Sequence, residues 1–374
     1  MNKDEDLFCE LLRTVVSGLG EYLTDNFDEM RFGRQHVTPV SFVKDWASRF
    51  AFRLGFVRLP PARQKLLLDR LERLQAHTAE WDRVSRLLED DASRNLLVAL
   101  LAYRILGYLH IRLPLSSTAQ RKDLKQRSDS LIAQSNLGTI SMGSISWPVN
   151  RYDLKDAGYD IQYEGLDVTT TFLLEQYCFR RKTCPEIGIR PGDIVVDGGA
   201  CTGDSALYAA WRAGDNGKVF CFECDQDNLT LLKRNLNLNP LMARRVQPMP
   251  FALWDRSGET LTFDSAGPGT HVSGTMGKRS VSTMSIDDLV RNHTAPRVDF
   301  IKLDVEGAEL RVLQGAETVL RTFQPRLAIS VYHKERDMFE IPLWIDNLKL
   351  GYRFHLDHFT IYGEETVLFA TAAS

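Results

Sequence analysis

The sequence predicts an α/β fold in which a doubly wound, mostly parallel sheet follows an α-helical N-terminal domain. Two features of the sequence support this prediction. From about residue 191 onward, short apolar β-branched runs alternate with helical patterns, which is typical of a parallel sheet covered by helices on both faces. In the first third of the chain, apolar residues instead recur at the spacing of amphipathic helices.

Composition and charge exclude several classes of protein. The 374 residues carry a net charge of -3, whereas nucleic-acid binders usually carry a basic surplus, so no nucleic-acid partner is expected. Six cysteines are too few for a disulfide framework in a chain of this length. The start of the chain, MNKDEDLF, lacks the features of a signal peptide, and we expect a cytoplasmic protein.

The longest apolar run is Leu96–Tyr103, which extends past Arg104 to Ile111. It is shorter than the roughly 20 residues of a membrane span and carries a charge, so we expect a buried helix and no membrane span.

Residues 1–115 are predicted to form the helical domain. Pro60-Pro61 begins a helix, and apolar residues recur after it at steps that fit one helical face. These residues are Leu67, Leu71, Leu74, Trp81 and Leu88. We expect a bundle that packs on itself or on the second domain, and the alternative is a module for homo-oligomerisation or for gripping the substrate. The segment Phe42–Leu59 mixes aromatic and basic residues and could touch a membrane surface, although a core helix with a solvated basic face is favoured.

Residues 116–150 are predicted to be a linker or an irregular segment, because they are charged at first and then rich in Ser, Gly and Asn. The third part, residues 151–374, is predicted to be the sheet domain. Its beginning, Arg151–Gly165, is expected to supply a short strand or hairpin, and Thr169–Phe179 a helix.

The stretch Asp193–Trp211 has the pattern of a strand, a glycine turn and a helix. Asp193–Val196 is short, apolar and β-branched, as a buried parallel strand should be. Asp197-Gly198-Gly199-Ala200 ends this strand with a carboxylate and two residues that can adopt positive φ. A helix is then expected to begin at Gly203-Asp204. Such a turn lets a ligand contact bare backbone at a helix N-terminus.

Further strands and helices alternate after this turn. The expected sheet strands are Lys218–Glu223, Arg244–Met249, Val298–Asp304 and Leu327–Val331. The expected helices run from Asp225 to about Asn237, from Ala308 to about Leu320, and over Phe339–Leu350. Extra strands are expected at Glu259–Asp264 and Arg279–Ser282, a capping box at Ser285 and Asp288, and an antiparallel pair at Tyr352–His355 and Thr366–Ala370.

In a doubly wound sheet, the ligand binds outside the carboxyl ends of the strands. Glu223 lies at the end of the second strand, where a carboxylate suits a bidentate contact with two ribose hydroxyls. A helix-capping or surface acid is the alternative. The glycine turn begins with Asp197, which disfavours the phosphates of a dinucleotide and favours a cation. S-adenosylmethionine, with a sulfonium and no phosphate, is therefore favoured over NAD.

Several stretches resemble the FkbM family of S-adenosylmethionine-dependent methyltransferases. They are VVDGGACTGDSALYA, FECDQDN, the late GYRFHL and, most specifically, IKLDVEGAELRVLQGA at Ile301–Ala316. The resemblance covers about residues 151–374 and none of the helical third. It implies the class I methyltransferase fold, with a seven-stranded sheet and a reversed last hairpin. It also implies O-methylation of a hydroxyl on a sugar, glycan or natural product.

The resemblance further implies binding roles for single residues. Asp197, Gly199 and Gly203 would line the methionine part of the donor, Glu223 the ribose and Leu253 the adenine. The complete expected donor-binding set is Asp197, Gly198, Gly199, Ala200, Gly203, Asp204, Glu223, Cys224, Asp225, Ala252, Leu253 and Asp304. Two positions depart from the family pattern: residue 201 is Cys where Asn is frequent, and Cys224 stands where Pro commonly follows the acid.

Methyl transfer to a hydroxyl needs a proton acceptor, and the candidate catalytic residues are Asp304, Glu306 and His333. Asp304, at the end of the fourth strand, is the first choice. Glu306 is equally consistent with a cap of the next helix. His333 follows the fifth strand, and His271, in a glycine-rich loop, is a weaker candidate.

Lys302 lies in an otherwise apolar strand and is expected to need a carboxylate partner, whether structural or catalytic. Asp304, Glu306 and His333 could bind a hard cation together, but they lack the fixed short spacing of a metal motif, so no metal is predicted. Cys221 and Cys224 form a C-x-x-C without a second pair, and a zinc or redox role is not expected.

Two functions remain. The first is an O-methyltransferase that uses S-adenosylmethionine and acts on a small molecule or a glycan. The alternative is a non-catalytic S-adenosylmethionine or nucleoside binder with a role in assembly. The loop Ser265–Arg279 and the helical domain are expected to shape the acceptor pocket.

Overall fold

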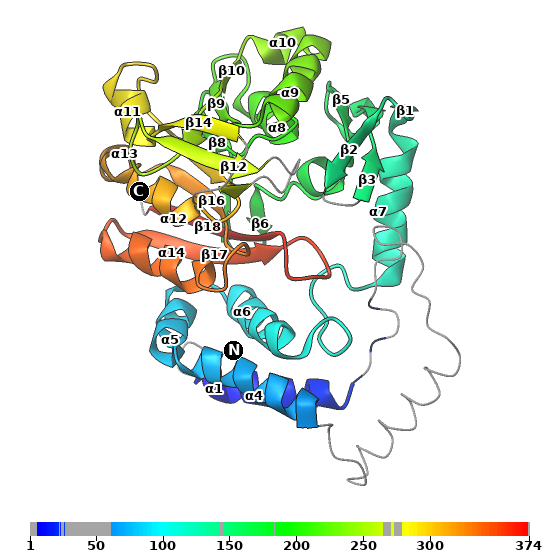
Figure 1. Ribbon diagram of the computed structural model, residues 1–374, viewed down its shortest axis with the longest axis vertical. Coiled ribbons are helices and arrows are strands. Elements are labelled where there is room, and N and C mark those ends of the chain that lie inside the picture. The colour runs from blue at the N-terminus through cyan, green and yellow to red at the C-terminus, as the bar shows by residue number, and fades with distance from the viewer. Residues whose placement is uncertain are drawn as a thin grey trace. The chain divides into compact units, whose positions relative to one another are not determined.

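The computed structural model describes residues 6–21, 23, 26, 61–142, 145–182, 184–264, 271–272 and 279–372 (Figure 1). The chain divides into two compact units, Met1–Lys125 with His358–Glu364 and Gln126–Asp357 with Glu365–Ser374. The segment Phe42–Leu59, for which a basic aromatic helix was predicted, lies outside the described residues.

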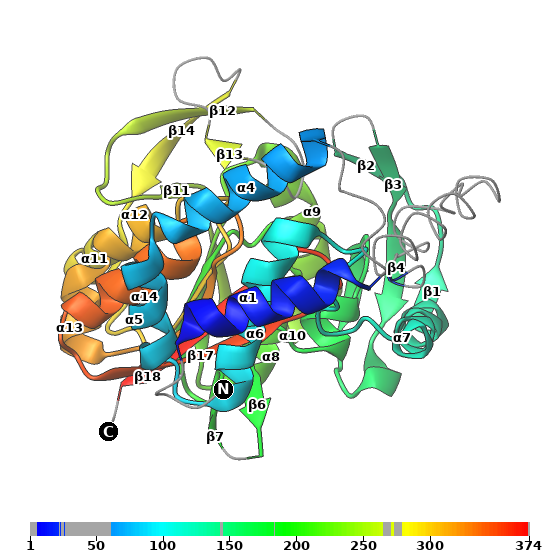
Figure 2. The same cartoon turned by 90° about the horizontal axis from the view of Figure 1, so that it is seen from below.

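The described part of the first unit is helical. Its helices are α1 (Leu7–Leu19), α4 (Pro61–Gln75), α5 (Thr78–Leu87) and α6 (Asp91–Leu106) (Figures 1 and 2). Helix α1 packs on α5 and α6, and α4 packs on α6. The apolar pattern after Pro61 is shared between α4 and α5, and its later members Leu74, Trp81 and Leu88 are buried. The helical domain over residues 1–115 stays a prediction.

The apolar run at Leu96–Tyr103 lies in α6, as predicted. Asp90 caps this helix because its side chain accepts a hydrogen bond from the Ser93 N–H at 2.8 Å. Leu97 and Leu101 of α6 are buried completely or almost so. Within the described residues, no helix combines the length and the apolar character that crossing a bilayer requires.

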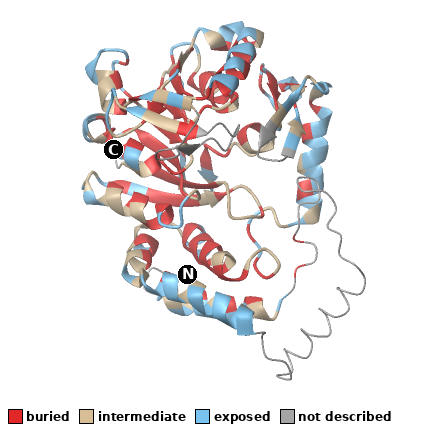
Figure 3. Ribbon diagram, viewed as in Figure 1, coloured by how far each residue is buried: buried red, intermediate tan, exposed pale blue. Residues whose placement is uncertain are grey.

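Residues 116–150 are more regular than the sequence predicted. They contain helix α7 (Thr118–Ser130) and strands β1 (Ile132–Gln134), β2 (Thr139–Met142) and β3 (Ile145–Pro148). Most side chains of α7 are exposed (Figure 3), so the helix carries no apolar stripe that would reveal it in the sequence. The expectation of an irregular segment was therefore wrong.

The segment that leads into the main sheet is only partly as predicted. The hairpin expected within Arg151–Gly165 is confirmed by antiparallel strands β4 (Asn150–Asp153) and β5 (Gln162–Gly165), with a short helix η1 (Lys155–Ala157) between them. The helix expected at Thr169–Phe179 is wrong in extent. The chain makes one π-helical turn, η2 (Thr169–Leu173), and then enters strand β6 (Phe179–Arg181), which pairs with β7 (Cys184–Ile187).

The second unit contains the predicted seven-stranded sheet, with the strand order β10-β9-β8-β15-β16-β18-β17. The strands are β8 (Ile194–Gly198), β9 (Lys218–Phe222), β10 (Val246–Met249), β15 (Phe300–Leu303), β16 (Arg326–Ser330), β17 (Tyr352–His358) and β18 (Thr366–Ala372). The first five in this order are mutually parallel, and β18 runs antiparallel to β16. Strands β8, β15 and β16 are buried along their whole length (Figure 3), which explains why most of their residues are apolar.

Helices alternate with these strands. They are α8 (Asp204–Ala213), α9 (Gln226–Leu238), α10 (Pro240–Ala243), α11 (Ile286–Arg291), α12 (Glu309–Gln314), α13 (Glu317–Phe323) and α14 (Asp337–Asn347). The starts of α8 and α9 agree with the sequence, and Asp225 caps α9 by accepting a hydrogen bond from the Asp227 N–H at 2.8 Å.

The single helix expected from Ala308 to Leu320 is wrong, because the chain forms α12 and α13 with a break at Gly315. A Cβ atom at Gly315 would lie 2.3 Å from the Trp254 carbonyl oxygen, so the glycine permits a close backbone approach there. The Asp287 carboxylate accepts the Val319 N–H at 2.9 Å and caps α13 from another helix.

A smaller sheet follows β10. It contains β11 (Ala252–Leu253), β12 (Thr260–Asp264), β13 (His271–Val272) and β14 (Arg279–Met284). Strands β12 and β14 lie where extra strands were predicted, and they pair antiparallel. Of the two hydrogen bonds of the predicted capping box, the structure contains one. The Ser285 hydroxyl accepts the Asp288 N–H at 3.2 Å, but the Ser285 N–H donates to the Ser257 hydroxyl at 2.9 Å instead of to Asp288.

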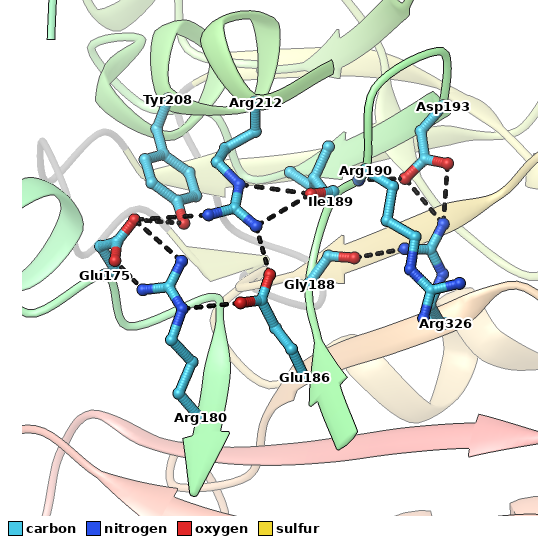
Figure 4. A network of polar contacts seen from close by, with 10 residues as sticks. All are labelled: Glu175, Arg180, Glu186, Gly188, Ile189, Arg190, Asp193, Tyr208, Arg212 and Arg326. Carbon is cyan, nitrogen blue, oxygen red and sulfur yellow. Dashed lines mark hydrogen bonds and ion pairs between the residues drawn. The ribbon is translucent and has the colours of Figure 1, made fainter. Parts of the chain in front are cut away.

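A buried ion pair joins the amino ends of β8 and β16 (Figure 4). One guanidinium nitrogen of Arg326 lies 2.7 Å from both carboxylate oxygens of Asp193, and Arg326 also donates to the Gly188 carbonyl. The Arg190 N–H donates to Asp193 at 2.6 Å. Both side chains of the pair are buried, so each charge depends on the other.

A second group of charges continues from this pair toward α8 (Figure 4). Arg212 of α8 contacts Glu186 of β7, and Arg180 of β6 lies between Glu175 and Glu186. The Tyr208 hydroxyl donates to Glu175 at 3.1 Å. These contacts hold the β6–β7 hairpin against α8.

We predict that Arg326→Met lowers the free energy of unfolding by about 3–5 kcal/mol, because it leaves Asp193 buried without its cation. Urea unfolding measured by tryptophan fluorescence tests this expectation. The control is Arg321→Met, which removes the half-exposed pair with Glu317 and should cost less than about 1 kcal/mol. Equal losses in the two variants would contradict the role given to the buried pair.

Candidate functional site

Lys302, in β15, holds the glycine turn that follows β8. Its Nζ atom lies 3.0 Å from Asp197 Oδ1 and donates hydrogen bonds to the carbonyl oxygens of Gly198 at 3.0 Å and Gly199 at 2.8 Å. Burial alone would lower the pKa of Lys302, but the charges of Asp197 and Asp304 raise it. The carboxylate partner that the sequence predicted for Lys302 is therefore Asp197.

Asp197 itself is almost completely buried, and its other oxygen, Oδ2, accepts a hydrogen bond from the Ser205 hydroxyl at 2.8 Å. Its carboxylate thus joins β8, β15 and the first turn of α8. The sequence predicted that Asp197 binds the methyl donor. The structure shows in addition that its carboxylate connects these three elements.

Gly199 brings the turn into direct contact with the end of β15. Its φ angle is +76°, and a Cβ atom at this position would lie 1.8 Å from the Asp304 carbonyl oxygen. The Asp304 N–H donates to the Gly198 carbonyl at 3.0 Å. Only glycine combines this conformation with this approach. Asp304 is thereby fixed beside the turn, at the end of β15, the fourth strand of the prediction.

The rest of the turn leads into α8. The Ala200 N–H donates to the Phe222 carbonyl at 3.0 Å, which ties the turn to β9. Gly203, with a φ angle of +94°, occupies the position before α8, and Asp204 begins the helix. Asp204 accepts a hydrogen bond from the Thr171 hydroxyl at 2.5 Å, and burial raises the pKa of its carboxyl.

The end of β9 carries the acid predicted to bind a ribose. Glu223 is buried, with 7% of its surface exposed, and its Oε1 atom accepts the Asp225 N–H at 2.7 Å. Burial raises the pKa of Glu223 to about 7. Asp225 is fully buried and receives a hydrogen bond from Arg279 at 2.9 Å through Oδ1, while its Oδ2 has no hydrogen-bond partner among the described residues. Burial raises the pKa of the Cys224 thiol to about 12, so this thiol stays neutral.

The residue predicted to contact adenine, Leu253, lies beside the turn. Ala252 and Leu253 form β11 and are buried. A Cβ atom at Gly198 would lie 2.8 Å from Leu253 Cδ1, so the leucine side chain packs directly on the turn. The loop expected to shape the acceptor pocket lies mostly outside the described residues, and of His271 only the backbone in β13 is described.

Asp304 contacts groups from two distant segments. The hydroxyls of Tyr177 and Tyr332 donate to its two carboxylate oxygens at 3.0 and 3.2 Å, and His333 Nε2 lies 3.4 Å from Oδ1. Burial alone would raise the pKa of Asp304, but the charges of Lys302 and His333 and the hydrogen bond from Tyr177 lower it.

His333 lies among three carboxylates. Besides Asp304, its Nε2 atom is 3.5 Å from Glu306 Oε2, and its Nδ1 atom is 2.9 Å from Glu309 Oε1. Burial alone would lower the pKa of His333, but its contact with Glu309 and the charge of Asp304 raise it to about 9. The structure thus brings together the three candidate catalytic residues Asp304, Glu306 and His333.

Glu309 was missed by the sequence analysis, although it begins α12. Its Oε1 atom accepts the N–H groups of Val305 at 2.9 Å and Gly307 at 3.3 Å, so it folds the turn after β15 back on itself. Glu306 lies in that turn with a φ angle of +54°. The carboxylate that caps this turn is therefore Glu309, and Glu306 is directed to His333.

Tyr177 and Tyr332 were also missed. Their hydroxyl groups donate hydrogen bonds to Asp304 from segments that are distant in the sequence, so no local sequence motif identifies the two tyrosines. The one feature of the sequence that could have identified Tyr332 is its position directly before His333, at the end of the fifth predicted strand.

Comparisons with known proteins agree with this geometry. Residues 197–354 match the family described as Methyltransferase FkbM domain. The hexuronic acid methyltransferase AglP of Haloferax volcanii is 32% identical over 133 residues, which cover 35% of this chain and 52% of that protein. This chain therefore spans about half the length of that relative.

A solved structure of methyltransferase FkbM from Methylobacillus flagellatus KT has the same fold. Its TM-score is 0.51 at 17% sequence identity, and the match covers 80% of this chain and 60% of the other. The sheet order and this structure agree on the fold, and residues 197–354 of this chain are similar to the Methyltransferase FkbM domain.

Proposed function

We propose that this chain is an S-adenosylmethionine-dependent methyltransferase that methylates a hydroxyl of a sugar or glycan. The position of Asp304 carries the proposal. Asp304 directly follows β15, where its backbone contacts the glycine turn and its carboxylate accepts hydrogen bonds from two tyrosine hydroxyls. A sugar acceptor is supported by the name of the Haloferax relative, a hexuronic acid methyltransferase.

The chemistry of the strand ends fits the donor. S-adenosylmethionine, when bound, supplies a methyl group on a positively charged sulfur and carries no phosphate. Glu223 and Asp225 offer buried carboxylates at the end of β9, and one oxygen of Asp225 lacks a hydrogen-bond partner within the described chain. Carboxylates accept hydrogen bonds from hydroxyls and attract a cation, whereas they repel phosphates.

Roles for the single residues follow from this arrangement. Glu223 would accept the ribose hydroxyls, Ala252 and Leu253 would pack against adenine, and the backbone of the turn at Gly199 would contact the methionine part. Asp304 would take the proton that the acceptor hydroxyl releases, while Tyr177 and Tyr332 hold its carboxylate in position. A positioned proton acceptor contributes about 10²–10⁴-fold to such reactions.

We predict that Asp304→Asn lowers the rate of methyl transfer by about 10²–10⁴-fold, because the amide cannot accept the proton. The assay follows radiolabelled methyl groups into oligosaccharides with and without glucuronic acid. Calorimetry with S-adenosylhomocysteine should show a much smaller loss of affinity, since binding does not require proton transfer. The exposed residue Asp156 supplies the matched control Asp156→Asn, which should change neither quantity.

The two measurements separate the proposed function from its alternative. If the wild-type chain binds S-adenosylhomocysteine but transfers no methyl group to any acceptor, the non-catalytic binder is favoured. If the wild-type chain does not bind it at all, both functions fail.

We predict that the affinity for S-adenosylhomocysteine rises about tenfold between pH 6 and pH 8. Glu223 has a pKa of about 7, and its ionised form is the better acceptor for the ribose hydroxyls, so binding strengthens as the proton leaves. The neighbouring thiols of Cys201 and Cys224 do not ionise in this range, because burial raises the pKa of both. Calorimetry across this range tests the trend, and Glu223→Gln should remove it. A pH dependence that persists in Glu223→Gln would assign it to another group.

A further inference from the structure

His333, Asp304, Glu306 and Glu309 form a compact group, here named the histidine–carboxylate cluster. The imidazole is its centre, with Asp304 and Glu306 at 3.4 and 3.5 Å from Nε2 and Glu309 at 2.9 Å from Nδ1. One potential ligand atom from each of Asp304, Glu309 and His333 lies within 4.8 Å of the other two.

Two buried side chains of the cluster have polar atoms without hydrogen bonds. The His333 side chain is only 8% exposed, and neither ring nitrogen makes a geometrically sound hydrogen bond with the described residues. Glu309 is completely buried, and its Oε2 atom has no hydrogen-bond partner within the same residues. Unsatisfied polar atoms at such depth are costly unless a ligand meets them.

The charges of the cluster are also unbalanced. Three carboxylates face one imidazole. Of the two nearby lysines, Lys302 is bound to Asp197 and the turn carbonyls, and Lys334 donates to the Gly307 carbonyl. A group of this composition requires a cation at its centre, either the protonated imidazole itself or a bound metal ion.

We propose that the cluster binds one divalent first-row transition-metal ion through His333, Asp304 and Glu309, with Glu306 beside the ion. Such ions bond to imidazole nitrogen and carboxylate oxygen at about 2.0–2.2 Å. Ligand atoms around one ion therefore lie about 3–4.4 Å apart, whereas those of the three residues lie within 4.8 Å of one another, so the side chains would move slightly closer together around the ion. A mixed imidazole and carboxylate set suits Mn²⁺ better than Ca²⁺ or Mg²⁺, which prefer oxygen alone.

The surrounding structure holds the ligands in place before an ion arrives. Glu309 is fixed by the N–H groups of Val305 and Gly307, and the His333 ring lies against the Tyr332 ring with centroids 4.1 Å apart. Asp304 is held by Tyr177 and Tyr332. Prior fixation of the ligands reduces the entropy lost when an ion binds.

The consequence for activity rests on the proposed methyl transfer. With Asp304 as a ligand, the ion would replace it as the group that promotes loss of the hydroxyl proton, because the ion would stabilise the negative charge that develops on the acceptor oxygen. Ion binding itself is measured without donor or acceptor, so failure of this inference and failure of the proposed function can be told apart.

The test is a titration of the full chain, freed of metal with a chelator, with Mn²⁺ alone, followed by the electron paramagnetic resonance signal of free Mn²⁺. We expect saturable binding of one ion per chain. Glu309→Gln and His333→Gln should each weaken binding by about tenfold or more, as the loss of a ligand or its support usually does. The exposed residue His293 supplies the control His293→Gln, which should bind as the wild type does.

Thermal unfolding of each variant shows whether it is folded, and Asp304→Asn is the replacement if His333→Gln is not. Absence of saturable Mn²⁺ binding in the wild type would overturn the proposal and leave the protonated imidazole as the cation of the cluster. Unchanged binding in both Glu309→Gln and His333→Gln would overturn it as well, because the ion would then occupy another place.

Discussion

The buried ammonium group of Lys302 is the contact on which the rest of this site depends. A charge inside a sheet is stable only with an opposite charge and satisfied hydrogen bonds, and Lys302 finds both in Asp197 and in the carbonyls of Gly198 and Gly199. One side chain thereby ties β15 to the turn after β8. The ends of these two strands meet as a consequence, and Asp304 is placed next to the turn.

The two ends of the sheet use charge in different ways. At the amino ends, Arg326 and Asp193 neutralise each other, and the contact is purely structural. At the carboxyl ends, acids outnumber bases: Glu223, Asp225 and Asp304 are all buried or nearly so. Burial shifts the protonation of such groups, and perturbed carboxyl groups in one region are typical of binding and catalytic sites. The amino ends of the strands thus carry a stabilising ion pair, and their carboxyl ends carry the candidate functional residues.

The sequence revealed those features that depend on local pattern. Buried strands are mostly apolar runs, and the glycine turn and the cap at Asp225 are short motifs, so the sheet and the strand-end residues could be predicted. Contacts between segments that are distant in the sequence produce no local sequence pattern. Tyr177 and Glu309 meet Asp304 and His333 only through the fold, and α7 escaped prediction because its exposed, polar sequence lacks an apolar face.

The contact between Gly199 and the Asp304 carbonyl limits how this domain can be redesigned. Any side chain at position 199 would push the end of β15 away from the turn, since a Cβ atom would lie 1.8 Å from that oxygen. A library that randomises the turn to alter donor preference must therefore keep this glycine constant. Surface loops that carry no part of this backbone junction can be varied more freely.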